Sequence, residues 1–596
     1  MTINEKLTAI RKLLTTNNLD AYIIPSSDPH QSEYPAALWQ SRAWISGFTG
    51  SAGYVTITQS TAYVWTDGRY FLQCVTETKD SEFELKKQIQ QGAPEHIDWL
   101  AETLPENSRV GCDSSLFSVG QVRSMQKMFD KKNIHLVTDA DLISPIWKDR
   151  PSLPKAEIFE HDVVFAGKSR TDKLNDIRAK MKAKGADFHL VTTLDDIGWT
   201  LNLRGSDVAC NPVFVAYLVI GMERCDLFIE SSKVLADIKT ALNHDGVIIR
   251  PYAMVSDFLS QLDESQAITI DSGNINFQLF SLLDRVHVIE GETFSIMMKA
   301  VKNETEQRLI REVMVKDGVA LTKAFMWLEK TLLERTVQEY EMASMLAQYR
   351  SDQAHYFGES FDAIIGYNGN GAIIHYHPDP HHSTEIARKG ILLLDSGGQY
   401  ADGTTDITRT ISLDGVPTAE QRQNYTAVLR GHIAIAQLKF PEGTKGIQMD
   451  TLARQYLWQL GLNFGHGTGH GVGFFMNVHE PPQGIVGVIN ARGTTAHKLG
   501  MLTSNEPGFY KEGEYGIRIE NLVLVVEDQE TAFGKFFKFD TVTLFPIDTH
   551  LIDLSALTVS ELNWINEYHE RVYTYLSPFL NELEIVWLED KCIKIG

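Results

Sequence analysis

Two carboxylates in the C-terminal half of the sequence lie at the ends of strand-like runs, where a buried acid would need a partner for its charge. Asp395 ends the apolar run Ile391–Asp395, a turn-forming stretch follows at 396–405, and Asp406 begins a second strand-like run. A hairpin of this kind can bring Asp395 and Asp406 to one site. The alternative is a polar hairpin with solvated acids, which suits Asp402 at the bend better than it suits Asp395.

Glu506 and Glu520 form a second pair of carboxylates that folding could bring to one site. Glu506 stands beside a proline turn, and Arg518 and Glu520 lie at i and i+2 of a strand-like run, hence on one face. An arginine in that position orients a buried glutamate and offsets its charge. An ordinary cross-strand ion pair is the alternative interpretation.

Histidines cluster in and near a glycine-rich run at 465–473 (GHGTGHGVG). Its glycines permit close backbone approach, so His466 and His470 can be directed into a crowded site. His479 follows in the same segment, and His375 ends the run AIIH. Three further histidines are interpreted as surface residues that at most capture a metal: His377, His381 and His382.

Four carboxylates and one neutral imidazole form an oxygen-rich set of donors that suits hard divalent cations. Two such cations bring four positive charges, which four carboxylates balance. The set fits manganese, iron, cobalt or zinc in a two-metal site about 3.5–4 Å across that shares an activated water.

Other chemistries are excluded because the sequence lacks their motifs. His479 and Glu480 are followed by prolines instead of completing HExxH, and no Walker loop, GxGxxG or GxSxG pattern occurs.

The elements that position these residues begin with a repeat. Residues 5–29 align without gaps on 172–196, and each copy has the pattern of a helix, a turn and a buried strand. Seams fall near 147–154 and near 299–303, where Asn303 and Glu306 form a capping-box pattern at the start of a helix. We therefore predict an α/β domain at 1–150, a related α/β domain at 151–302 and a third domain at 303–596.

The composition limits the class of protein and the partners that it can bind. The chain has 596 residues, 55 Lys plus Arg against 77 Asp plus Glu, and a formal charge of −22. This balance argues against nucleic acid or an anionic membrane as a partner. We find neither a signal-peptide pattern nor an apolar run of about 18 residues. The five cysteines have no metal spacing, so we expect thiols in a reducing cytoplasm.

These motifs resemble the pita-bread metallopeptidases, and within them the long three-domain cytosolic Xaa-Pro aminopeptidase (aminopeptidase P) type. The resemblance runs essentially end to end. Its matching segments are IIPSSDPHQSEY, GFTGSAG, WTDGRYFLQ, NLRGSD, NPVF, KAVKN, NGAIIHY, LLDSGGQYADGTTDITRT, GHGTGHGVG, NVHE and NEPG with GIRIEN. It implies two related creatinase-like α/β domains followed by a pita-bread catalytic domain with a C-terminal extension.

The resemblance also implies a role for each candidate ligand. Asp395 and Asp406 would bind one metal, with Asp406 also reaching the other. His470 would be the lone imidazole ligand, and Glu506 and Glu520 would complete the set, with Glu520 bridging. Glu506 would act in addition as the general base for the attacking water.

Other matching residues would handle the substrate. By the resemblance, His375 and His479 contact the substrate and the tetrahedral intermediate, and His466 lines the pocket. Arg518 would hold Glu520, and Arg69 would reach the extended peptide. No motif of the resemblance falls on 484–496, so that segment is given no role.

The function implied is release of the N-terminal residue from peptides with proline in second position, with two divalent ions, Mn²⁺ first among them. A homodimer is expected. Three alternatives share the scaffold. A prolidase would act on Xaa-Pro dipeptides, a methionine aminopeptidase lacks the two preceding domains, and a non-catalytic binding module would have lost its metal ligands.

Overall fold

The structure, a computed structural model, describes residues 1–89, 93–381 and 383–596. It divides into two compact units. The N-terminal unit comprises Met1–His161, Lys168–Ala209 and Val213–Ser295, and the C-terminal unit comprises Asp162–Gly167, Cys210–Pro212 and Ile296–Gly596. The predicted boundaries at 1–150, 151–302 and 303–596 stay a prediction.

The N-terminal unit holds two six-stranded sheets of the same design. The first has the order β4 (Glu84–Lys87), β3 (Ala62–Thr66), β2 (Tyr54–Thr58), β1 (Ala21–Pro25), β5 (Arg109–Cys112) and β6 (His135–Val137). The second has the order β12 (Val247–Pro251), β11 (Cys225–Ile229), β10 (Ala216–Gly221), β8 (Phe188–Val191), β13 (Ala267–Ile270) and β14 (His287–Glu290). In each, the fourth strand pairs antiparallel on one side and parallel on the other.

The sequence repeat falls on corresponding elements of these two sheets. The first copy forms α1 (Ile3–Thr16) and β1, and the second forms α7 (Arg170–Lys184) and β8. Both helices begin with a side-chain cap, at Thr2 and at Ser169. The strand that follows each helix takes the same place in its sheet, so the repeat corresponds to a shared topology.

Helices flank both sheets. Those of the first half are α2 (Ser41–Ser46), α3 (Phe71–Thr78), α4 (Glu95–Thr103) and α5 (Val119–Asp130); those of the second are α8 (Leu194–Leu201), α9 (Ala236–His244), α10 (Val255–Ser260) and α11 (Phe277–Phe280). The predicted seam at 147–154 has no helix or strand. Among the described residues, no helix is both long enough and apolar enough to cross a membrane.

The long helix of the C-terminal unit is α13 (Glu304–Thr331), which follows α12 (Phe294–Ala300). The predicted capping box is present, because Asn303 accepts from Glu306 N and the Glu306 side chain accepts from Asn303 N. The predicted apolar face of α13 is buried: Leu309, Ile310, Val313, Leu321, Phe325 and Leu328.

Three sheets lie at the centre of this unit. The largest has the order β23 (Lys439–Pro441), β30 (Gly534–Thr541), β29 (Asn521–Thr531), β26 (Leu502–Asn505), β24 (Gly469–Gly471) and β25 (Glu480–Ile485). The smaller two are β17 (Ile364–Tyr367), β19 (Ile391–Ser396), β22 (Ile407–Ser412) and β16 (Tyr356–Glu359), β20 (Gly398–Tyr400), β21 (Gly403–Thr404). A hairpin of β27 (Gly508–Lys511) and β28 (Tyr515–Arg518) contacts β19 and β22.

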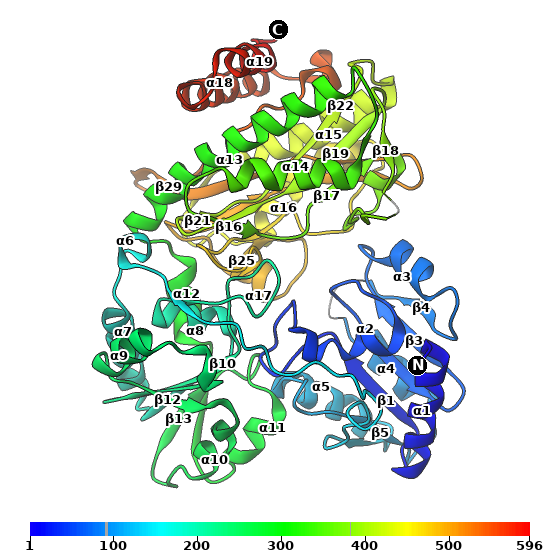
Figure 1. Ribbon diagram of the computed structural model, residues 1–596, viewed down its shortest axis with the longest axis vertical. Coiled ribbons are helices and arrows are strands. Elements are labelled where there is room, and N and C mark those ends of the chain that lie inside the picture. Colours follow the sequence, from blue (N-terminus) through cyan, green and yellow to red (C-terminus); the bar gives the residue numbers. More distant parts are fainter. Residues whose placement is uncertain (90–92, 382) are drawn as a thin grey trace. The chain divides into compact units, whose positions relative to one another are not determined.

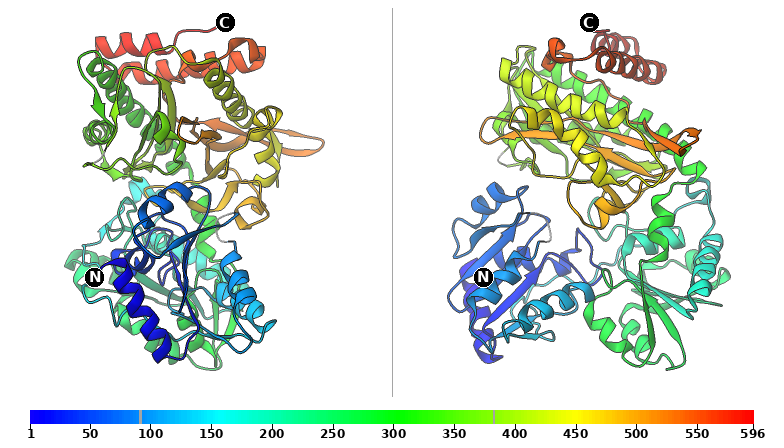
Figure 2. Two further views of the ribbon diagram at one scale, coloured as in Figure 1. Left: turned by 90° about the vertical axis from the view of Figure 1, so that its right-hand side faces the viewer. Right: turned by 180° about the vertical axis from the view of Figure 1, so that it is seen from behind.

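Two helix pairs cover these strands. The green pair α13 and α14 (Glu339–Ser351) lies on one side, and the pair α15 (Ala419–Ala436) and α16 (Gly446–Gln459) lies on the other (Figures 1 and 2). The terminal helices α18 (Val559–Leu576) and α19 (Glu582–Lys591) contact α13. The strands are therefore buried between helices, which explains why their acids lie in the interior.

The Asp395 hairpin is more elaborate than expected. β19 pairs antiparallel with β22 so that Asp395 faces Thr408, and Asp406 directly precedes β22. The predicted bend carries β20 and β21 and folds inward. The expectation that Asp402 is solvated is wrong, since its side chain is buried and pairs with Lys316 from α13.

Candidate metal centre

Three of the predicted ligands converge at one point. Single ligand atoms of Asp406, His470 and Glu520 all lie within 4.8 Å of one another. The three residues come from separate elements: the start of β22, the middle of β24, and the junction between β28 and β29. Asp406 and Glu520 are buried, and His470 is largely buried.

Glycines let the histidine strand enter this site. A Cβ atom at Gly469 would collide with the backbone oxygen of Ser504, and one at Gly471 with that of Glu480. β24 therefore fits between β25 and β26 only because His470 is flanked by residues without side chains.

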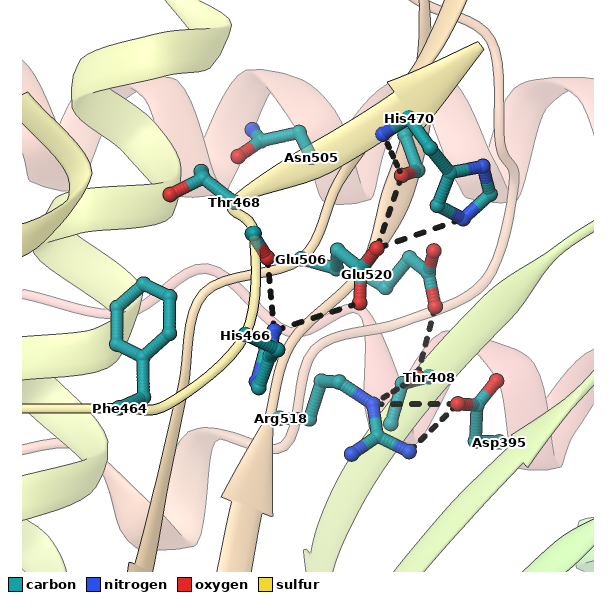
Figure 3. Close-up of polar contacts among 12 residues, drawn as sticks. Asp395, Thr408, Phe464, His466, Thr468, His470, Asn505, Glu506, Arg518 and Glu520 are labelled. Atoms are coloured by element: carbon teal, nitrogen blue, oxygen red, sulfur yellow. Dashed lines mark hydrogen bonds and ion pairs between the residues drawn. The ribbon is translucent and has the colours of Figure 1, made fainter. Parts of the chain in front are cut away.

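Glu506 joins the group from the end of β26. Its Oε1 lies 3.4 Å from His470 Nε2, and that nitrogen lies 3.5 Å from Asp406 Oδ2. The backbone N–H of Glu506 donates to Thr468 O at 2.8 Å, and the Ser504 hydroxyl donates to its carboxylate at 3.2 Å. The loop is thus fixed at both its backbone and its side chain, and Figure 3 shows the side-chain contacts.

Asp395 is held at the other side of the site by Arg518. Two guanidinium nitrogens donate to Asp395 Oδ2, and Arg518 Nε also donates to the Thr408 hydroxyl at 3.1 Å. The Thr408 hydroxyl donates in turn to Glu520 Oε2 at 2.8 Å (Figure 3). Arg518 was expected to hold Glu520; it acts on that residue through Thr408 and pairs directly with Asp395.

The carboxylates raise one another's pKa. Burial and then the charges of Asp395 and Glu506 raise the pKa of Asp406 well above its usual range. Burial followed by Asp406 and Glu506 does the same to the pKa of Glu520, and burial raises the pKa of Glu506 to about 7. Positive charge placed beside such a group lowers its pKa and favours the ionised form.

The donor set fits divalent cations. It offers four carboxylates and one imidazole, the oxygen-rich combination that suits two hard ions. The second oxygen of Asp395, Oδ1, is buried and has no hydrogen-bond partner within the described ranges. A cation bound at this oxygen would supply the missing partner.

A further predicted histidine packs against His470, and another follows a turn that contacts the strands of the site. The rings of His479 and His470 are 4.3 Å apart between centroids and nearly perpendicular. His375 follows the turn η5 (Asn368–Ala372) and is half-buried. That turn contacts β19 and β28, the strands of Asp395 and Arg518.

His466 lies beside Glu506, with Nδ1 3.9 Å from Oε2, and a tyrosine that sequence reasoning missed links it to Arg518. Arg518 donates to the Tyr510 hydroxyl at 2.7 Å, so that hydroxyl donates onward to His466 Nε2 at 2.8 Å. His466 Nδ1 then carries the proton and donates to Gly467 O at 2.7 Å. Tyr510 and Arg518 share one face of the hairpin β27–β28, and this depends on a strand register that the sequence does not reveal.

The remaining predictions fall elsewhere. Arg69 lies in the N-terminal unit, where it forms a two-pronged ion pair with Asp67 at 2.8 Å. His377 and His381 are exposed, and His382 lies outside the described residues. The segment 484–496 contains the end of β25 and α17 (Ala491–Thr494), and no role is assigned to it.

Family models match along the chain. The model of metallopeptidase family M24 matches 308–527, and that of the family's C-terminal region matches 535–595. Two models of the creatinase/prolidase N-terminal domain match 6–143 and 149–306. The fold and the site thus define a peptidase of the M24 class, and the predicted fold class is confirmed.

The relatives that match over the full length of the chain belong to one group within this family. Xaa-Pro aminopeptidase 1 of Dictyostelium discoideum is 41% identical over 99% of this chain and 96% of that protein. Aminopeptidase P2 of Arabidopsis thaliana is 39% identical, over 97% and 86%. The crystal structure of an X-prolyl aminopeptidase from Caenorhabditis elegans, described as a cytosolic enzyme with a di-nuclear active site, matches all of both chains at 34% identity and a TM-score of 0.95. The chain belongs to the Xaa-Pro aminopeptidases of metallopeptidase family M24.

Proposed function

We propose that this chain is a two-metal aminopeptidase that releases the N-terminal residue from peptides with proline in second position. The observation that carries the proposal is the convergence of Asp406, His470 and Glu520 within 4.8 Å. The proposal is supported by Xaa-Pro aminopeptidases that are about 40% identical over nearly the whole chain.

Five residues would hold the ions: Asp395, Asp406, His470, Glu506 and Glu520. Two bound ions would supply Lewis acidity toward the scissile carbonyl and an activated water. Mn²⁺ is our first choice for both, with zinc, cobalt and iron next, because the donors are mostly carboxylate oxygens.

The chain's own groups would move the protons. Glu506 would take a proton from the attacking water, a task that suits a carboxyl whose pKa burial has raised to about 7. The departing proline nitrogen is a secondary amine and must be protonated to leave. Glu506 or His375 would deliver that proton, and His375 and His479 would bind the polarised carbonyl oxygen.

Selectivity for proline would depend on ring shape. The bond before proline is a tertiary amide without an N–H, so a pocket built for it offers no acceptor there. A secondary amide would then leave a buried donor unpaired. Arg69 would contact the peptide beyond proline, and the acidic site would anchor the terminal ammonium group.

Three finer assignments belong to the same proposal. We assign a homodimer, a cytoplasmic location, and domain boundaries near 150 and 302. The matched ranges 6–143 and 149–306 support the first boundary.

A peptide panel tests the function. Protein loaded with Mn²⁺ should release the first residue from Xaa-Pro-Pro, release little from Xaa-Ala-Pro, and release none after N-acetylation. Cleavage of Xaa-Pro dipeptides alone would indicate a prolidase. Comparable cleavage of the Xaa-Ala peptide would indicate a general aminopeptidase, and no hydrolysis of any peptide would favour a binding module.

A further inference from the structure

One fully buried carboxylate outside the metal centre accepts hydrogen bonds from the last residue of a strand and from the loop that follows it. Glu339 is the first residue of α14, and its side chain is inaccessible to solvent. Its Oε1 accepts from the backbone N–H of Tyr367 at 2.8 Å and from Asn370 Nδ2 at 3.0 Å. Its Oε2 accepts from the Tyr376 hydroxyl at 2.7 Å and from Thr384 N at 3.2 Å.

These donors bracket His375. Asn370 lies in the turn before it, Tyr376 follows it directly, and Thr384 closes the loop that began at Asn368. The backbone of Glu339 makes one more hydrogen bond to this loop, since its N–H donates to Thr384 O at 3.0 Å. One side chain therefore contacts the chain before His375, directly after it, and at Thr384.

The other side of the same turn is fixed by backbone contact. A Cβ atom at Gly516 would collide with the backbone oxygen of Gly371, so the turn lies directly against β28. β28 carries Arg518, which pairs with Asp395. The turn before His375 is thus held between β28 and Glu339.

We propose that Glu339 is a positioning residue that sets the place of His375 relative to the metal centre. The inference rests on the proposed function, in which His375 contacts the substrate. It adds a residue that no sequence motif in the C-terminal half singled out.

The chemistry of the partners requires a carboxylate at this position. The backbone N–H groups of Tyr367 and Thr384 can only donate, and the Asn370 amide presents its NH₂ group to both oxygens. Burial and the hydrogen bond to Glu339 raise the pKa of Tyr376, so its hydroxyl keeps the proton that it donates. In Glu339→Gln, one oxygen becomes an NH₂ group that faces donors, and part of the network must open.

The kinetic test compares Glu339→Gln with a matched control on the same helix. Glu341→Gln makes the same change two residues on, where the carboxylate is partly exposed and pairs with Arg335. We expect Glu339→Gln to lower kcat by roughly 10²-fold with near-normal metal content, since small displacements of a reacting group have effects of this size. Glu341→Gln should keep kcat and metal content near the parent values.

Coupling to His375 separates positioning from a general structural role. In a His375→Ala background, Glu339→Gln should produce little further loss of kcat, because the group it positions is gone. Equal losses in both backgrounds would overturn the proposal. If Glu339→Gln fails to fold, Tyr376→Phe removes one hydrogen bond and keeps the ring, and its smaller effect should vanish in the same background.

Hydrogen–deuterium exchange provides a readout that does not depend on hydrolysis. Glu339→Gln, or Tyr376→Phe in its place, should speed exchange in 368–384 and leave the strands β26 and β29 unchanged. Unchanged exchange in that segment would overturn the proposal even for a protein that cleaves no Xaa-Pro peptide. Faster exchange together with an inactive parent protein would contradict the proposed function and leave the loop's dependence on Glu339 standing.

Discussion

Arg518 donates two hydrogen bonds to a single oxygen of Asp395, from Nη2 at 2.6 Å and from Nε at 3.1 Å (Figure 3). Both side chains are buried. The arrangement leaves Asp395 Oδ1 turned to the interior without a hydrogen-bond partner among the residues described. Arg518 thus offsets part of the negative charge of the site while keeping one carboxylate oxygen available to a cation.

Replacing Arg518 should weaken metal binding. Arg518→Met leaves Asp395 as a buried charge without its partner, and we expect metal affinity to fall by roughly 10- to 100-fold. Arg518→Lys keeps the charge but loses the fork of donors, so its affinity should lie between those of Arg518→Met and the parent. Titration calorimetry with Mn²⁺ measures this order, with Arg335→Met, which removes a surface ion pair, as the control. Parent-like affinity in Arg518→Met would contradict the role assigned to this pair.

Removing the metals should affect stability as well as activity. Four buried carboxylates repel one another without cations, so chelation should abolish hydrolysis and lower the melting temperature by ligand linkage. Asp406→Ala and Glu520→Ala should each lose both ions, because each is assigned as a bridge. Metal content by mass spectrometry and thermal melting check this, with the exposed Asp414→Ala as the control. Full activity in metal-depleted protein would refute the two-metal proposal.

Much of the fold could be predicted because its signals are local. The repeat at 5–29 and 172–196 gave a helix followed by a buried strand in each copy, and both strands take the same place in their sheets. The capping box at Asn303 and the apolar face of α13 needed only neighbouring residues. Such patterns survive folding because they are properties of single elements.

What could not be predicted depends on contacts between distant segments. Asp402 was expected in solvent since it sits in a turn, yet Lys316 from α13 pairs with it in the interior. Tyr510 joins the site through Arg518, and Glu339 through a loop that begins 29 residues later in the sequence, at Asn368. No local pattern of residues encodes partners of this kind.

Alanine variants of the histidines should fall into two groups, those that lose metal and those that lose kcat alone. His470→Ala should reduce metal occupancy, because its Nε2 lies within 3.5 Å of two carboxylates. His479→Ala and His375→Ala should instead lower kcat by roughly 10²-fold or more with metal content near normal. Parallel measurement of kcat and bound metal distinguishes the two, and the exposed His244→Ala serves as the control. Loss of metal in His479→Ala would mean that the ligand set is wrong.

Two buried histidines that are assigned no part in the reaction should make the C-terminal unit sensitive to acid. Burial lowers the pKa of His497 and of His569 to about 4 in the folded protein, whereas an unfolded histidine titrates near 6.5. Between about pH 6.5 and 4 the unfolded state therefore binds protons that the folded state does not. The free energy of unfolding should fall by about 1.4 kcal/mol per pH unit for each histidine across this window.

The variant His497→Leu tests this sign, because neither ring nitrogen of His497 has a hydrogen-bond partner in the described part of the chain. The melting temperature of His497→Leu relative to the parent should rise as the pH falls from 7.5 to 5, since the leucine cannot take up a proton on unfolding. Above pH 7 the two proteins should show a constant difference. A difference that stays the same at pH 5 and pH 7.5 would show that His497 is not held neutral by burial.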